Sequence, residues 1–178
     1  MPDIRLYILM EHEDDPRKCT AANLVRHGEA RRASAIASIP RGAVVLDPEA
    51  ERSISAEDLP IVRKLGILAL DCSWKKLERF PRIKTGLRHR AIPFTVAANP
   101  VNFGKPQMLT TAEALAASVY ILGEKGQAHR LMSRFRWGET FLDINLERLE
   151  AYSSAATSAE VVEAQERAIQ RLIAAKTG

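Results

Sequence analysis

The chain has 178 residues, of which 46% are apolar, and this content suffices for one domain or for two small lobes that share a core. No apolar run approaches the roughly 20 residues of a membrane-spanning helix. The N-terminus turns acidic soon after Met10 and does not resemble a signal peptide. The formal net charge of +4 is compatible with a polyanionic partner.

The first half of the chain alternates short β-rich segments with short helical ones. Thr20 is expected to cap a helix that stops at Gly28, and Ser55 with Asp58 forms a capping-box pattern for a second helix. Strands are predicted at residues 4–10, 42–48, 66–74 and 91–100, and a further helix at 75–80. This alternation predicts an α/β fold with a parallel sheet.

The character of the sequence changes near Thr110, where strong helix formers take over. Helical spacing of apolar residues continues through four segments, at 110–123, 125–138, 139–152 and 158–176. We therefore expect an N-terminal α/β lobe at residues 1–94 and a mainly helical lobe at residues 95–178 that completes a site at their seam.

Unusual combinations of polar residues, proline and tryptophan lie at the ends of three of the predicted strands. The sequences LDP (46–48), LDCSW (70–74) and AANPVNFGKP (97–106) each come directly after an apolar run. Because ligands of open parallel sheets bind beyond the carboxyl ends of the strands, these three segments are expected to converge on one site. The third segment is stiffened by two prolines and leads into a helix N-terminus, where exposed backbone amides favour an anion.

Four blocks of sequence resemble the signature blocks of one enzyme family. They are DPRKCT (15–20), LDCSW (70–74), VAANPVNFGKP (96–106) and FRWGETFLDINLERLEAY (135–152). The family is that of the small-subunit ribosomal RNA aminocarboxypropyltransferases, which are ribosome biogenesis factors related to the knotted SPOUT-type RNA methyltransferases. The resemblance covers residues 4–152 and implies a trefoil-knotted, SPOUT-like topology.

The resemblance also implies an activity. Members of the family use S-adenosylmethionine to transfer its 3-amino-3-carboxypropyl group to N3 of a (N1-methyl)pseudouridine in small-subunit ribosomal RNA. The implied cofactor is therefore S-adenosylmethionine, and the implied partner is small-subunit ribosomal RNA or the pre-ribosomal subunit.

Nine residues match cofactor-binding positions of the family. By this resemblance Thr20 and Thr111 hold the carboxylate of the aminocarboxypropyl arm, although simple helix capping also explains a threonine at each place. The remaining seven match positions that pack around the adenosine and sulfonium or bind the adenine and ribose through the main chain: Leu46, Pro48, Leu70, Trp74, Leu77, Ile92 and Gln107.

Asp71, at the end of a predicted buried strand, is the candidate catalytic residue. An aspartate is ordinarily a weak base, so Asp71 is expected to orient the uracil or stabilise positive charge if it does not abstract the proton. The alternative is that Asp71 only caps the turn that follows. If Trp74 covers the sulfonium methyl, the γ-carbon of the arm is left facing the RNA, and the choice of transferred group becomes a matter of orientation.

Six basic residues flank the predicted site and are candidates for phosphate contacts: Arg17, Lys18, Lys75, Lys76, Arg88 and Arg90. The four histidines show no metal-ligand spacing, and no metal is predicted. Cys19 and Cys72 are interpreted as free, buried thiols. A cytoplasmic monomer without membrane attachment is expected.

Two other functions remain open from the sequence. One is plain methyl transfer to RNA by a SPOUT-like domain, and the other is a non-catalytic ribosome-assembly factor that binds ribosomal RNA. Labelled cofactor distinguishes methyl transfer from aminocarboxypropyl transfer. A test of cofactor binding distinguishes the non-catalytic assembly factor from both enzymes.

Overall fold

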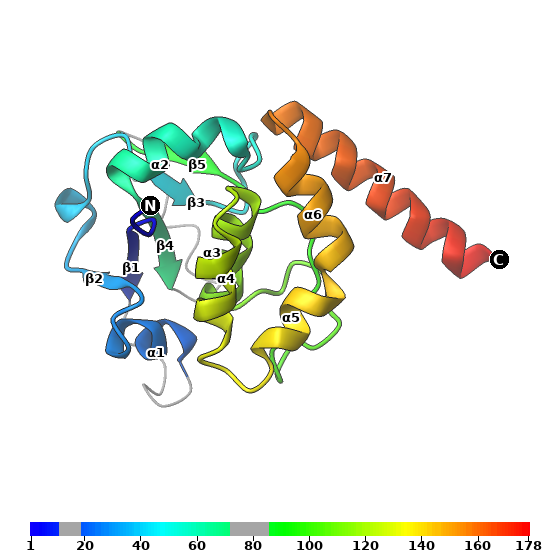
Figure 1. Cartoon of the computed structure of the whole chain (residues 1–178), viewed down its shortest axis with the longest axis horizontal. Helices are drawn as coiled ribbons and strands as arrows, with labels where there is room; N and C mark the ends of the chain where they lie inside the picture. The colour runs from blue at the N-terminus through cyan, green and yellow to red at the C-terminus, as the bar shows by residue number, and fades with distance from the viewer. Residues whose placement is uncertain (11–18, 72–85) are drawn as a thin grey trace.

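The computed structural model describes residues 1–10, 19–71 and 86–178. Figure 1 shows a small sheet packed against helices, with one long helix that extends away from the body and carries the C-terminus. In the described residues no helix is long and apolar enough to cross a membrane. The same residues contain no group of three or more histidine, cysteine, aspartate or glutamate side chains arranged to hold a metal ion.

The sheet has five strands in the order β2-β1-β4-β3-β5, and every pairing is parallel. The strands are β1 (Leu6–Met10), β2 (Arg31–Ala33), β3 (Val44–Leu46), β4 (Ile67–Asp71) and β5 (Arg88–Arg90). The predicted α/β class with a parallel sheet is therefore confirmed. The described strand order does not confirm the trefoil knot that the resemblance implied.

Two short helical turns and seven α-helices accompany the sheet within the described residues. The 3-10 turns are η1 (Ile36–Ser38) and η2 (Ala56–Asp58). The α-helices are α1 (Thr20–Arg26), α2 (Leu59–Leu65), α3 (Thr111–Ile121), α4 (Lys125–Met132), α5 (Gly138–Ile144), α6 (Leu146–Ser154) and α7 (Ser158–Thr177). The expected capping box of Ser55 and Asp58 is present and opens η2, which runs directly into α2.

The strand predicted at 91–100 is wrong. This segment forms only isolated bridges, and its backbone is satisfied partly by loop backbone and partly by helix side chains instead of by a neighbouring strand of the sheet. The Phe94 amide donates to Gln165 Oε1 at 2.7 Å, and the Val96 amide donates to Asn145 Oδ1 at 2.8 Å. Prolines at 93 and 100 lack the amide that a central strand needs, which explains why an apolar run here leaves the sheet.

The two edge strands were not predicted. Both β2 and β5 are three residues long and rich in arginine, so neither shows the apolar alternation that identifies a strand in a sequence. Parallel pairing to β1 and to β3 creates them, and only the tertiary structure brings those partners together.

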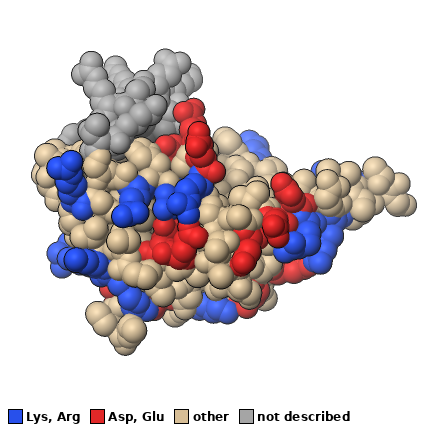
Figure 2. All heavy atoms as spheres, turned by 90° about the horizontal axis from the view of Figure 1, so that it is seen from above, with Lys and Arg blue, Asp and Glu red and all other residues tan. Residues whose placement is uncertain are grey.

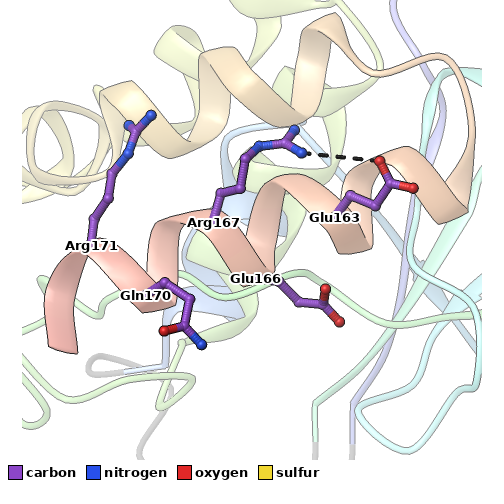
Figure 3. A pocket seen from close by; sticks show the side chains of 5 residues that line it. All are labelled: Glu163, Glu166, Arg167, Gln170 and Arg171. Atoms are coloured by element: carbon purple, nitrogen blue, oxygen red, sulfur yellow. Dashed lines mark ion pairs between the residues drawn. The ribbon is translucent and has the colours of Figure 1, made fainter. Parts of the chain in front are cut away.

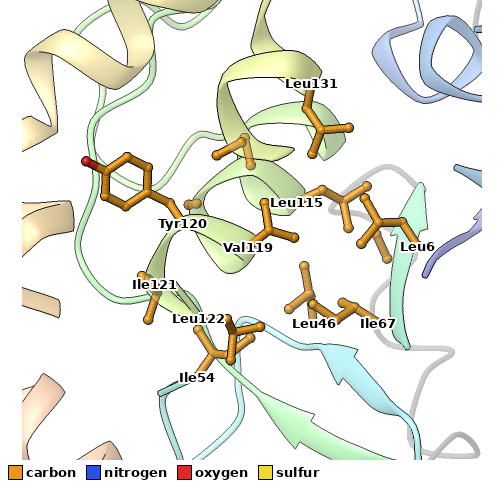
Figure 4. Close-up of a cluster of buried hydrophobic side chains, with 14 of the residues drawn as sticks. Leu6, Leu46, Ile54, Ile67, Leu115, Val119, Tyr120, Ile121, Leu122 and Leu131 are labelled. Atoms are coloured by element: carbon orange, nitrogen blue, oxygen red, sulfur yellow. The ribbon is translucent and has the colours of Figure 1, made fainter. Parts of the chain in front are cut away.

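The larger core lies between the sheet and the helices (Figure 4). Leu6, Leu46 and Ile67 from the strands pack with Leu115 and Val119 from α3 in a single cluster. A smaller cluster around Val45 and Leu68 covers the other face of the sheet. Residues of both predicted lobes share the larger cluster, and the division at residue 95 stays a prediction.

Candidate active site

The site is centred on Asp71, the last residue of β4, where two helices begin. The Thr111 hydroxyl at the start of α3 donates a hydrogen bond to Asp71 Oδ1 at 2.9 Å. The Cys19 thiol at the start of α1 donates to Asp71 Oδ2 at 3.2 Å. Thr20 joins the same junction, because its Oγ1 accepts a hydrogen bond from the Ala112 amide at 3.3 Å. Three predicted site residues, Thr20, Asp71 and Thr111, are thus brought together.

The caps of these helices differ from those expected. Cys19, and not Thr20, is the N-cap of α1, and its sulfur accepts from the Ala22 amide at 3.4 Å. The expectation that Thr20 caps the helix is therefore corrected: Thr20 is the first helical residue, and its hydroxyl turns to α3 instead. Thr110 caps α3 with a complete capping box, which leaves the Thr111 hydroxyl free to bind Asp71.

The electrostatics of the junction favour a neutral thiol. Burial raises the pKa of Cys19 above its ordinary value, the negative charge and hydrogen bond of Asp71 raise it further, and the Ala22 amide opposes the shift. Cys19 is half-buried and free, and its sulfur makes two contacts in the described structure: it caps α1 and it donates a hydrogen bond to Asp71. From the sequence, Cys19 was predicted only to be a free, buried thiol.

Glu113, one turn into α3, fixes the stiff loop in front of the helix. Its buried carboxylate accepts from the Ala98 and Asn99 amides at 2.8 and 3.0 Å through one oxygen. The other oxygen accepts from the Asn99 side-chain amide at 2.9 Å and from the Thr110 amide at 2.7 Å. Glu113 was not among the predicted site residues, although the Thr110–Glu113 capping-box spacing was a usable signal.

The predicted adenosine-binding residues lie along the same edge of the sheet. Leu46 ends β3 and is buried in the larger core, Pro48 follows it and is exposed, and Ile92 comes just after β5. Because neighbouring strands are about 4.8 Å apart, the edge from β4 across β3 to β5 spans about 10 Å, which suits an extended nucleoside. Leu70, by contrast, packs with the smaller cluster on the opposite face of the sheet.

Gln107 and Ile92 contact each other. The Gln107 side chain donates to the Ile92 carbonyl at 3.3 Å, and the Gln107 amide donates to the Thr95 carbonyl at 2.9 Å. The backbone φ of Gln107 is +58°, an unusual value for a residue other than glycine. The main-chain amide of Gln107 is thus used within the loop, and the side-chain hydrogen bond holds together the two residues whose backbone groups are predicted to bind the adenine edge.

Of the six predicted RNA-binding residues, the structure describes two. Arg88 is exposed on β5, as a phosphate contact requires. Arg90 is only 7% exposed and forms a buried ion pair with Asp58, at 2.9 Å, which favours a structural role, and its contact with RNA stays a prediction. Arg88 and Arg90 lie on the same face of β5, and the ion pair with Asp58 of η2 accompanies the burial of Arg90 alone. The remaining site residues that lie outside the described residues are Arg17, Lys18, Trp74, Lys75, Lys76 and Leu77.

An open pocket lies elsewhere, along α7. Figure 3 shows its lining side chains, which are Glu163, Glu166, Arg167, Gln170 and Arg171. The Arg167–Glu163 pair within it is 4.0 Å long and largely exposed, so it contributes little energy. None of the predicted site residues lines this pocket, and the junction at Asp71 remains the candidate site.

Comparison with known proteins identifies the family. Residues 44–169 match the family described as "Ribosome biogenesis protein, C-terminal". The 16S rRNA aminocarboxypropyltransferase of Methanosarcina mazei is 50% identical over 165 residues, which cover 92% of this chain and 94% of that protein. The enzyme of the same name from Methanothermobacter thermautotrophicus is 48% identical and covers 93% of this chain and 99% of its own.

A solved structure gives the same result. The SAM-dependent rRNA:acp-transferase Tsr3 from Vulcanisaeta distributa superposes with a TM-score of 0.83 at 35% identity, over 94% of this chain and 97% of that one. None of these matches is described as a SPOUT-type methyltransferase, so the SPOUT relationship inferred from the sequence is not supported. The agreement of sequence and structure over nearly the whole length shows that the chain belongs to the 16S rRNA aminocarboxypropyltransferase family.

Proposed function

We propose that this protein transfers the 3-amino-3-carboxypropyl group of S-adenosylmethionine to small-subunit ribosomal RNA. Relatives of this name are 40–50% identical to the chain over 90% or more of its length, and a SAM-dependent rRNA:acp-transferase shares its fold. The observation that carries the proposal in the structure is the junction at Asp71, where the start of α3 meets the carboxyl end of β4.

The groups at this junction fit the charged ends of an amino-acid arm. In the described part of the chain, the Thr111 amide has no hydrogen-bond acceptor, whereas the Ala112 and Glu113 amides donate to threonine hydroxyls. A free amide at the N-terminus of α3 favours a carboxylate. The Asp71 carboxylate beside it favours an ammonium or a sulfonium. When bound, the donor supplies the carbon electrophile of the transfer.

The contacts of Asp71 favour charge stabilisation over proton abstraction. Both of its oxygens already accept hydrogen bonds, from the Thr111 hydroxyl and the Cys19 thiol. These donors hold the carboxylate in one orientation, which suits a group that positions a cation at the reacting end of the arm. Thr20, Asp71 and Thr111 are therefore proposed to hold the arm. Leu46, Pro48, Leu70, Ile92 and Gln107 are proposed to hold the nucleoside.

The proposal extends to the acceptor atom, the oligomeric state and the place of action. The acceptor is taken as N3 of a (N1-methyl)pseudouridine, and the enzyme as a cytoplasmic monomer acting during ribosome assembly. Figure 2 shows Lys and Arg side chains spread over one face of the molecule, with groups of acidic side chains between them. Arg88, exposed at the edge strand β5, is the described candidate for a phosphate contact.

Two differently labelled forms of the donor test the proposal directly. The protein is incubated with small-subunit RNA and with S-adenosylmethionine that carries label either in its carboxyl group or in its methyl group. Carboxyl label entering the RNA is expected, and methyl label entering it instead would establish methyl transfer. Binding of RNA without any effect of S-adenosylmethionine on the melting temperature would support the non-catalytic assembly factor.

Asp71→Asn tests the site within the same assay. Asparagine keeps the shape but loses the charge, so we expect weaker donor binding and a fall in turnover of about tenfold or more. Asp143→Asn, at an exposed position on α5, is the matched control and should behave like the wild type. Equal activity of the two variants would remove Asp71 from the mechanism.

A further inference from the structure

The loop at residues 97–108 presents an unusual concentration of exposed apolar side chains. Within it Val101 is 82% exposed, Phe103 is 63% exposed and Met108 is 37% exposed. The other strongly exposed large apolar side chains of the described residues are Met1 and four residues of the helices α5 to α7. Exposure of apolar surface to water is unfavourable in free energy. A group of exposed apolar side chains on one loop, with an aromatic ring among them, therefore indicates a binding surface.

The loop is held rigid by its own backbone. The Ala97 amide donates to the Lys105 carbonyl at 3.0 Å, and the Gly104 amide returns a hydrogen bond to Ala97 at 2.8 Å. Inside this frame the Asn102 amide binds both the carbonyl and the side chain of Asn99, at 3.2 and 3.0 Å. Phe103 therefore lies on an ordered turn. The loop loses little conformational entropy when a partner binds Phe103.

The same loop is attached to the candidate active site. Glu113 of α3 binds Ala98 and Asn99 at the start of the loop and the Thr110 amide at its end. The next residue, Thr111, donates to Asp71. The exposed tip and the proposed arm-binding groups are thus parts of one hydrogen-bonded unit, so whatever contacts Phe103 is positioned relative to Asp71.

The chemistry of the tip fits single-stranded RNA. The loop contains no acidic residue and carries one cation, Lys105, whose exposed side chain lies 3.4 Å from Asn102 Oδ1. An aromatic ring next to a cation, without a carboxylate, matches an unpaired base and its phosphate. We propose that Phe103 stacks on an unpaired base of the RNA substrate next to the modified nucleotide, while Lys105 contacts its backbone. This inference rests on the proposed function for the identity of the RNA.

The test compares Phe103→Ala, Phe103→Tyr and Lys105→Gln with the wild type, using a labelled hairpin transcript of small-subunit RNA and, separately, S-adenosylmethionine. Phe103→Ala should weaken RNA binding by about tenfold, as expected for loss of one base–aromatic stack. Phe103→Tyr keeps the ring and should restore the affinity. Donor affinity should be unchanged in all three. Ile173→Ala, which truncates another strongly exposed apolar side chain on α7, is the control and should bind RNA normally.

Salt dependence separates the two side chains. Loss of stacking in Phe103→Ala should lower affinity by the same factor at every salt concentration. Lys105→Gln should instead reduce the slope of log affinity against log salt by about one contact.

Two outcomes would overturn the inference, and a third would overturn the proposed function without it. RNA affinity of Phe103→Ala within about twofold of the wild type, with normal donor binding, overturns it. A change in self-association by sedimentation, with RNA affinity intact, also overturns it, because the loop is then a protein contact. Wild-type protein that binds the hairpin but transfers no aminocarboxypropyl group contradicts the proposed function alone, since the role of Phe103 is still decided by the ratio of binding constants.

Discussion

Asp71 connects two side chains that the sequence places far apart, and its charge acts on both of them. The Cys19 thiol responds most directly, because a neighbouring carboxylate opposes formation of a thiolate. A cysteine at a helix start is often reactive, and here the carboxylate works against that tendency.

Asp71→Asn should therefore make Cys19 more reactive. Removing the negative charge lowers the pKa of the thiol, so alkylation by iodoacetamide should become faster between about pH 7 and 9. Peptide mass spectrometry measures Cys19 separately from Cys72. Identical alkylation rates of Cys19 in the two proteins across this range would show that Asp71 does not control the thiol.

Glu113 is the second residue whose chemistry depends on a complete set of partners. Four donors converge on its two oxygens, two on each. Glu113→Gln replaces one oxygen with an amide group that cannot accept, so two donors lose their acceptor whichever way the side chain turns. The expected cost is about 2–4 kcal/mol, read as a lower urea midpoint.

The control for this change is Glu163→Gln on α7. The Glu163 side chain is 66% exposed, and its substitution should change the free energy of unfolding by less than about 0.5 kcal/mol. A similarly small effect of Glu113→Gln would mean that the loop does not depend on the carboxylate.

At the scale of the elements, the turn between α2 and β4 depends on Gly66. This residue ends α2 with φ of +88°, and an added Cβ would lie 2.7 Å from the Arg5 carbonyl oxygen and from Tyr7 Cε2. The close approach of β1 leaves no room for a side chain there. Gly28, after α1, has φ of +72° but nothing within 4 Å of an added Cβ.

The two glycines form a matched pair. Gly28→Ala should cost about 1–2 kcal/mol from backbone strain alone. Gly66→Ala adds a steric clash with backbone and should cost about 1–3 kcal/mol more. Urea unfolding of both variants measures the difference, and equal losses of stability would show that β1 can move aside without cost.

At the scale of the whole molecule, an ionic cluster joins the N-terminal segment to the helical half. Glu29, between α1 and β2, accepts from Arg130 and Arg134 of the α4 region at 3.0 and 2.6 Å, and Arg130 also pairs with Asp3. Burial by itself raises the pKa of Glu29, but hydrogen bonds from Arg134 and Arg130 outweigh it and hold the pKa below 4.5.

This lowered pKa gives the stability a defined pH dependence. The stabilisation by ionised Glu29 is present above the unfolded pKa, near 4.5, and is lost as the pH falls through the lower folded pKa. Glu29→Gln should cost about 1 kcal/mol at neutral pH, since the arginines are partly exposed. The difference from the wild type should shrink as the pH falls below about 4. A difference that is independent of pH would exclude this linkage.

Local signals in the sequence identified much of the fold. The apolar runs at β1, β3 and β4 predicted parallel strands, and the Ser55–Asp58 pair and Gly28 marked a helix start and stop where the structure has them. These features depend on residues close together in the chain, so a single sequence contains them. The family blocks likewise identified the family from contiguous residues.

Contacts between distant residues decided the rest. The segment at 91–100, expected to be a strand, stays outside the sheet, and Gln165 and Asn145, far along the chain, accept hydrogen bonds from two of its amides. Arg90 is an internal ion-pair partner because Asp58 lies beneath β5. The sequence by itself determined which segments are apolar, stiff or helix-starting, since those properties depend on neighbouring residues. Only the tertiary structure decided that Cys19, Asp71 and Thr111 meet at one point, because packing of α1 and α3 at the end of β4 places their donors around one carboxylate.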